Sequence, residues 1–200
     1  MQRFDRLFAG ITLGLVIPVV IMCLSWWGSY LFGLGDTYVK WGAIVGLLVG
    51  LFLDKIVLRG LVNNFYNLSL VVLFALYLSY SVGLLGFFMG VPVFNVFVGA
   101  AAGVYTGRKA KINGQDRRKF REALKKTAVL ATVVLLAVCS FSTFVALVDS
   151  STAANLQGML HLGFEITRMM IWSLIVLGGL ALLAVQLLLV YTAGKAAYNK

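Results

Sequence analysis

Four polar residues in the last quarter of the chain recur at helical spacing and are the first candidates for chemistry. A continuous helix would place them on one face, because they stand at i, i+4, i+8 and i+11: Gln157, His161, Glu165 and Arg168. Glu165 is spaced to pair with either His161 or Arg168. We call this set the outer polar stripe. It predicts either the wet side of an interfacial helix or a polar mouth that binds a small charged solute.

The outer polar stripe holds too few ligands for a metal centre. His161 is the only histidine of the chain, and the acids that other outer loops would add are Asp36 and Asp149. The sequence also has no G-x-S-x-G, H-E-x-x-H or Walker A motif and no cysteine pair at redox spacing. We therefore predict no catalytic residue, no metal and no cofactor. A lipid-modifying enzyme that uses His161 and Glu165 remains a third hypothesis.

Three further polar residues interrupt long apolar runs and would line a ligand or ion path: Asp54, Asn95 and Gln186. An ionisable residue inside a membrane span is a functional candidate by default. A local ion pair with Lys55 or Arg59 would explain Asp54 as well. Asn95 has no charge near it in sequence, so it would either hydrogen-bond a neighbouring helix or, with nearby hydroxyls, bind a neutral ligand. Those hydroxyls belong to Tyr77, Ser79, Tyr80 and Ser81.

The composition and the charge-free runs of the sequence predict which helices position these residues. Of the 200 residues, 61% are hydrophobic and 12% are charged, and the mean hydropathy is +0.96. Soluble domains carry about 25% charged residues. No charge occurs from Leu7 to Gly35 or from Gly60 to Gly107. A helix needs about 20 apolar residues to cross a bilayer, so the second run is long enough for two crossings.

We predict an all-α polytopic membrane protein in which residues 1–200 form a single transmembrane domain. Six transmembrane helices are expected at about 8–32, 38–58, 68–88, 92–107, 127–148 and 167–193, with short interfacial helices near 115–126 and 153–165. Pro18 should kink the first span. Because the fourth span is short, the third and fourth either cross fully or form a partly re-entrant hairpin.

A basic segment, residues 108–126, sets the expected orientation. It carries nine of the seventeen Lys and Arg and only two acids, and its Asn113-Gly114 pair predicts a turn. Such a segment marks a cytoplasmic loop, which also places both termini in the cytoplasm. We expect a multi-pass protein of the cell membrane. The net charge of +10 is then explained by the orientation of the chain in the membrane, and no nucleic-acid partner is predicted.

The basic segment would contact anionic lipid headgroups or a cytosolic partner through its exposed cations. The candidates for this contact are Arg117, Arg118, Lys119 and Arg121. The other partners that we expect are the lipid bilayer itself and further chains, in a homo-oligomer or a heteromeric membrane complex.

Glycines recur every four residues in two spans. One stripe comprises Gly42, Gly46 and Gly50 and leads to Asp54, and the other follows Asn95 with Gly99, Gly103 and Gly107. Small residues at this spacing let helix backbones approach closely in lipid. Both spans would run in the same direction, so the two stripes are expected to pack on each other or to line the ligand path.

The glycine run from Gly42 to Asp54, G-x-x-x-G-x-x-x-G-x-x-x-D, resembles a segment in the substrate-binding membrane subunits of energy-coupling-factor vitamin transporters. The likeness covers thirteen residues. It implies a six-span subunit that binds a vitamin and docks on a coupling subunit. The first span lacks the alanine-rich docking face that this role needs.

The leading functional hypothesis is a small integral membrane protein that binds or translocates a small solute or ion, as a transporter or channel does. The alternative is a non-catalytic membrane subunit that docks a cytosolic partner through the basic segment.

Overall fold

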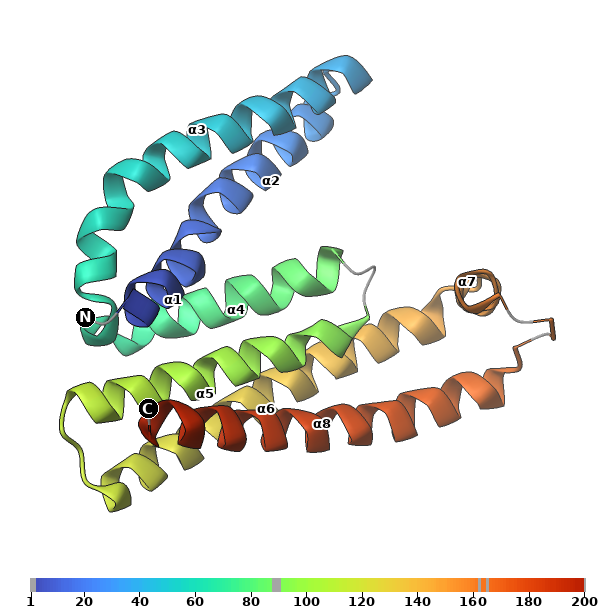
Figure 1. Cartoon of the computed structure of the whole chain (residues 1–200). Coiled ribbons are helices and arrows are strands. Elements are labelled where there is room, and N and C mark those ends of the chain that lie inside the picture. The colour runs from blue at the N-terminus through green and yellow to red at the C-terminus, as the bar shows by residue number, and fades with distance from the viewer. Residues whose placement is uncertain (1–2, 88–90, 162, 165, 200) are drawn as a thin grey trace. The chain divides into compact units, whose positions relative to one another are not determined.

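The computed structural model describes residues 3–87, 91–161, 163–164 and 166–199, and 89% of the chain is helical with no strand in these ranges. The prediction of an all-helical protein is thus confirmed. The chain divides into two compact units, Met1–Leu76 and Tyr77–Lys200, and each is described here by itself (Figure 1). Whether both belong to a single transmembrane domain stays a prediction.

Unit 1 is built on a helical hairpin. It contains α1 (Arg3–Gly14), α2 (Val16–Leu31), α3 (Asp36–Asn63), the short 3₁₀ helix η1 (Phe65–Asn67) and the first turns of α4 (Leu70–Phe87). The helix is interrupted between Gly14 and Val16 because Pro18 lacks an N–H and its ring crowds the carbonyl four residues earlier. The interruption expected from Pro18 is therefore found.

The glycine stripe of α3 packs against α2. A Cβ at Gly50 would lie 2.5 Å from Pro18 Cα, and one at Gly46 would lie 2.9 Å from the Ile21 carbonyl oxygen. Glycine therefore lets the two backbones touch, which favours association in lipid. The contacts run in opposite directions along the two helices, so α2 and α3 are antiparallel.

A buried acid connects α1 to the turn that follows α3 in unit 1. Asp5 of α1 is 1% exposed, and its Oδ1 accepts a hydrogen bond of 2.9 Å from the Tyr66 hydroxyl of η1. Phe8 and Phe65 pack edge to face beside this bond. The polar and aromatic residues after α3 thus form a packed turn that anchors α1, since a buried carboxylate needs such a partner.

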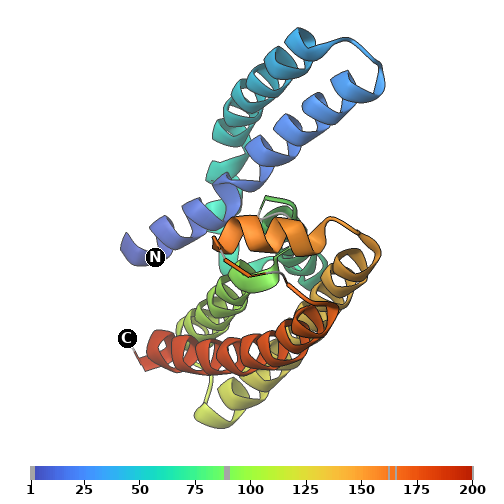
Figure 2. The same cartoon turned by 90° about the vertical axis from the view of Figure 1, so that its right-hand side faces the viewer.

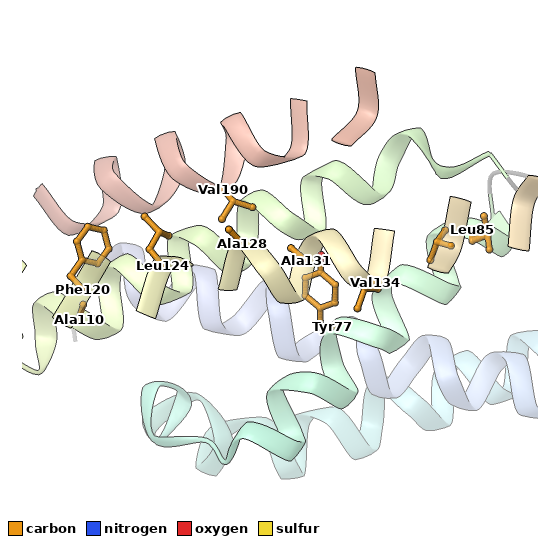
Figure 3. Packing of buried hydrophobic residues seen from close by; sticks show 10 residues of the cluster. Tyr77, Leu85, Ala110, Phe120, Leu124, Ala128, Ala131, Val134 and Val190 are labelled. Atoms are coloured by element: carbon orange, nitrogen blue, oxygen red, sulfur yellow. The ribbon is translucent and has the colours of Figure 1, made fainter. Parts of the chain in front are cut away.

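Unit 2 is a helical bundle in which α5 (Asn95–Ile112), α6 (Arg117–Val148) and α8 (Arg168–Asn199) lie side by side in both views (Figures 1 and 2). The 3₁₀ helix η2 (Pro92–Phe94) leads into α5. A row of α6 side chains forms the core, with Val190 of α8 on one side and Tyr77 of α4 on the other (Figure 3). The row comprises Leu124, Ala128, Ala131 and Val134.

The basic segment is mostly helical, as predicted for its second part near 115–126, and its first residues are helical as well. The helix α5 continues through the cations to Ile112, and α6 begins at Arg117, where Asp116 caps its N-terminus by accepting a 2.7 Å hydrogen bond from the Arg117 N–H. Only a short turn separates them, and Gly114 has the positive φ of 59° that such a turn requires. The Asn113-Gly114 turn is confirmed. The helix expected at 115–126 is no separate element but the first part of α6.

Three helices of the described chain are long and apolar enough to cross a membrane. They cover Arg3–Ser29, which joins α1 and α2, and then Arg117–Val148 and Arg168–Asn199; a shorter apolar helix covers Leu70–Leu85. Their length and composition are compatible with a membrane protein. The six-span arrangement, the cytoplasmic termini and the choice of the cell membrane stay predictions.

Candidate functional site

The glycine stripe of α5 packs against α8. A Cβ at Gly99 would lie 2.9 Å from Gln186 Cγ, one at Gly103 would lie 2.5 Å from the Val190 carbonyl oxygen, and one at Gly107 would overlap the Gly194 carbonyl oxygen. The expectation that the two glycine stripes pack on each other is wrong, because α2 covers one and α8 covers the other. The spacing of glycines in the sequence indicates a close-packing face but does not indicate which helix packs on it.

These contacts set α5 and α8 parallel and offset. Eighteen residues of α8 precede Gln186, but only four residues of α5 precede Gly99. At 1.5 Å per residue, α8 therefore extends roughly 21 Å beyond the start of α5. Figure 1 shows this overhang of α8 past η2. The polar N-terminal end of α5 consequently lies level with the middle of the apolar part of α8.

Asn95 is the first residue of α5 and is only 3% exposed. Its Nδ2 donates a hydrogen bond of 3.2 Å to the backbone carbonyl of Ser81 in α4. Its Oδ1 is buried and has no hydrogen-bond partner in the described structure, and the same holds for Ser81 Oγ. One side of the Asn95 amide thus fixes it to α4 while the other side stays available.

Gln186 of α8 packs against Gly99, which lies one helical turn after Asn95 on α5. The side chain of Gln186 is 1% exposed. Neither its Oε1 nor its Nε2 finds a partner among the described residues. It stands nine residues before Lys195, roughly 13 Å along α8 from the nearest charge. We call Ser81, Asn95 and Gln186 the buried polar cluster.

The chemistry that the cluster offers is hydrogen bonding. Its free groups are two amide oxygens that accept, one amide NH₂ that donates and one hydroxyl that does both. Leaving a buried polar group unmatched costs about 1–3 kcal/mol. No group of three or more His, Cys, Asp or Glu in the described chain is placed to hold a metal. The arrangement suits binding of a polar molecule, with no nucleophile or titrating pair for catalysis among its members.

Asp54, the third residue of the expected path, belongs to unit 1. It follows Gly50 by one turn on α3 and is 8% exposed, and its Oδ1 has no hydrogen-bond partner among the described side chains. The structure records no ion pair between Asp54 and Lys55. The side chain of Arg59 lies outside the described residues. The structure joins Asn95 to Ser81 by a hydrogen bond and packs Gln186 against Gly99, one helical turn after Asn95 on α5. Asp54 belongs to unit 1 and is not part of this group.

The outer polar stripe does not lie on one continuous helix. The predicted helix near 153–165 is found as α7 (Thr152–Leu160), which contains Gln157 and ends early because His161 adopts a left-handed conformation with φ of 50°. Arg168 opens α8. Glu165 lies outside the described residues. His161 is exposed, so its expected role as a solute-binding or catalytic group stays a prediction.

The four basic candidates fall into two groups on the first turns of α6. Arg117 and Arg121 line a pocket of about 340 Å³ between α6 and α8. Arg118 pairs with Glu122 at 3.5 Å on an exposed part of the helix, and Lys119 is exposed as well. Their contacts with lipid or with a cytosolic partner stay predictions.

Sequence reasoning missed two features of the molecule. The first is the buried Asp5, which formed no part of the prediction because nothing in the local sequence indicates its hydrogen bond to Tyr66, sixty-one residues away. The C-terminal residues Tyr191, Lys195 and Tyr198 line the α6 pocket. Their i, i+4 and i+7 spacing at the end of an apolar helix is the signal that would have indicated a shared face.

Comparison of the chain with protein-family models, with curated proteins and with solved structures finds no match. The resemblance of Gly42–Asp54 to vitamin-transporter subunits thus gains no support, and the buried polar cluster carries the functional argument alone.

Proposed function

We propose that this chain is an integral membrane protein that binds a small uncharged polar solute at the buried polar cluster and passes it across the bilayer. One observation carries the proposal. Four side-chain atoms of Ser81, Asn95 and Gln186, from three different helices of unit 2, are buried without a hydrogen-bond partner. Polar groups that face the interior of a membrane bundle are costly and usually mark a substrate path.

The start of α5 supports the same reading. The overhang of α8 puts η2 and Asn95 level with the apolar middle of α8, so non-helical backbone would stand at membrane depth. Such backbone is tolerated where protein buries it or where it lines a polar cavity. Interrupted helices of this kind form the binding sites of many transporters. This geometry favours the re-entrant arrangement of α4 and α5 over two full crossings.

An uncharged solute fits better than an ion. The cluster itself contains no ionisable side chain, and its free groups include both donors and acceptors. A solute with hydroxyl, carbonyl or amine groups on more than one side would satisfy them together. Glycerol and urea are suitable first probes because they are small, uncharged and hydrogen-bond in both senses.

The test measures glycerol and urea entry into proteoliposomes by stopped-flow light scattering. Gln186→Leu should reduce entry to the rate of protein-free liposomes, since it removes two of the free polar atoms. It should also raise the free energy of unfolding in detergent by about 1–2 kcal/mol, because an unmatched buried amide is replaced by an apolar group of similar size. A purely structural glutamine predicts the opposite result, a loss of stability.

Two variants serve as controls. Thr192→Val removes a hydroxyl from the same helix, but this hydroxyl already donates to the Leu188 carbonyl at 2.8 Å. Asp54→Asn changes the buried acid on α3 of unit 1. Both should leave solute entry unchanged. Wild-type entry no faster than protein-free liposomes for either probe would refute passage of solutes of this size. A slower rate in Asp54→Asn would contradict the assignment of solute passage to the buried polar cluster alone.

A further inference from the structure

The pocket between α6 and α8 is a second built feature of unit 2, at the charged end of both helices. Its volume is about 340 Å³, at the lower end of the ~300–1,000 Å³ range of small-molecule sites. Its lining residues are Arg117, Phe120, Arg121, Leu124, Lys125, Tyr191, Lys195, Tyr198 and Asn199. No carboxylate is among them. The buried polar cluster does not contribute to this pocket, so the two sites are separate.

The pocket has an apolar floor. Phe120 and Leu124 are buried, and the ring of Tyr198 stacks on Phe120 with centroids 4.3 Å apart and planes within 4°. The Tyr198 hydroxyl donates a 2.8 Å hydrogen bond to the Gln115 carbonyl, which holds the end of α8 against the start of α6. Leu124 also lies against Gly194, so the two helices meet closely below the pocket. The floor is therefore preformed.

Four cations surround this floor. Arg117, Arg121 and Lys125 recur every four residues on one face of α6, and Lys195 faces them from α8. All four side chains are exposed, and within the described chain the structure records no ion pair for any of them. By contrast, Arg118 on the neighbouring face is paired with Glu122. The pocket thus concentrates unneutralised positive charge.

The charged pocket borders the apolar surface of the same two helices. No charge follows Lys126 in α6 or stands between Arg168 and Lys195 in α8. Just beyond the pocket, Val129 is 64% exposed and Leu188 is 61% exposed. A ligand seated there would meet cations at one end and lipid-facing side chains at the other. That is the chemistry of a phospholipid at a membrane boundary.

We propose that the α6–α8 pocket binds the headgroup of one anionic phospholipid. The phosphodiester lies among Arg117, Arg121, Lys125 and Lys195, the glycerol rests on Tyr191 and Leu124, and the acyl chains run along the exposed apolar faces of α6 and α8. Arginine suits this role because its guanidinium donates two parallel hydrogen bonds to a phosphate. The pocket holds one headgroup and is too small for a segment of an acidic protein. The proposal rests on membrane insertion and not on solute passage.

The experiment is a native mass spectrometry titration of the full chain in detergent with phosphatidylglycerol. Phosphatidylcholine with the same acyl chains tests the need for net negative charge, and sn-glycerol 1-phosphate tests the water-soluble headgroup alone. We expect a first phosphatidylglycerol bound at least tenfold more tightly than phosphatidylcholine. Glycerol phosphate should not displace it at equal concentration.

Matched double variants separate this pocket from diffuse charge. Arg121→Gln with Lys195→Gln removes two pocket cations and should weaken the first phosphatidylglycerol about tenfold or more. Lys119→Gln with Lys126→Gln removes two exposed cations outside the pocket and should change affinity less than twofold. All four side chains are exposed, so both variants should keep the wild-type unfolding temperature.

Three outcomes would overturn the proposal. Equal losses in both double variants would mean diffuse attraction to the basic surface. Displacement by glycerol phosphate would indicate a soluble anion. If the pocket variant retained phosphatidylglycerol but lost a protein that co-purifies with the wild type, the cations would serve a docked partner.

Discussion

The two glycine stripes have the same spacing, yet the faces they form differ in content. In unit 1, Gly42, Gly46 and Gly50 pack against the serines and the proline backbone of α2, and the Ser29 hydroxyl bonds to the Ser25 carbonyl within its own helix. In unit 2, Gly99 packs against Gln186, whose amide has no partner among the described residues. Close packing is common to both faces. In the second face the unmatched polar group lies directly opposite a glycine, whereas in the first face the unmatched group is Asp54, which follows Gly50 by one turn on the same helix.

The difference indicates how a packing motif differs from a binding site. Hydroxyls adapt to a helix interface because they can bond to the carbonyl four residues earlier, as Thr106 and Thr127 also do while contacting each other at 2.8 Å. A glutamine amide has two polar ends and cannot satisfy both in this way. Its retention opposite a glycine is therefore better explained by a ligand than by packing.

The largest effect on stability should come from adding a methyl group to either glycine stripe. Gly50→Ala and Gly103→Ala each put a methyl group 2.5 Å from backbone atoms of the facing helix, Pro18 Cα and the Val190 carbonyl oxygen. Because backbone cannot move aside cheaply, each variant should lose about 1–3 kcal/mol or more of unfolding free energy in detergent. Gly179→Ala, where nothing lies within 4 Å, is the control. It should gain about 0.5–1 kcal/mol from helix propensity. Similar behaviour of all three would mean that the faces are not packed.

A smaller effect on stability but a clear one on solute entry is expected at Gly99. A Cβ there meets the flexible side chain of Gln186, and no backbone atom is among its three nearest neighbours. Gly99→Ala should therefore cost less than about 1 kcal/mol, since the glutamine can move. The same movement should slow glycerol and urea entry in proteoliposomes. Unchanged entry with a displaced glutamine would argue against a role of Gln186 in binding.

The smallest effect is expected at Asp149, an exposed acid whose carboxylate has hydrogen-bond donors, unlike the unmatched groups of the buried polar cluster. Hydrogen bonds from the Ser151 hydroxyl and the Ser151 N–H, 2.7 and 2.9 Å long, hold the pKa of Asp149 below its ordinary value of 3.8. A lowered folded-state pKa means that this stabilisation is present above pH 3.8 and is lost as pH falls through the folded pKa. Ser151→Ala should move the pKa of Asp149 back towards 3.8. A carboxyl ¹³C NMR titration of both proteins measures the shift, and equal titration curves would show that the turn is not formed.

Local patterns predicted the helices and their interruptions well, because these depend on nearby residues. Pro18 breaks the first helix and Asn113-Gly114 turns the chain, each through its own backbone restrictions. The helical end of α5 was missed because the predicted span was ended at the first charge, Arg108, although Lys109, Ala110 and Lys111 are good helix formers.

Long-range partners could not be predicted in the same way. Periodicity shows that Gly99 faces a helix but not that the helix carries Gln186, and it shows a basic face on α6 but not that Lys195 completes it. Both pairings depend on which helices meet and at what register, which a single sequence does not encode locally. Asn95 and Gln186 were predicted as site residues on polarity alone. The structure adds the hydrogen bond from Asn95 to Ser81 and the packing of Gln186 against Gly99.

The parallel pairing of α5 with α8 has a consequence for synthesis. The hairpin of α2 and α3 can close as soon as its second helix leaves the ribosome. The glycine face of α5 must wait for Gln186, which follows Gly99 by 87 residues. At about 5–20 residues per second, that wait lasts roughly 4–17 seconds. During this interval the glycine face of α5 lacks the helix α8 that covers it, and a chaperone of membrane insertion would act in this period.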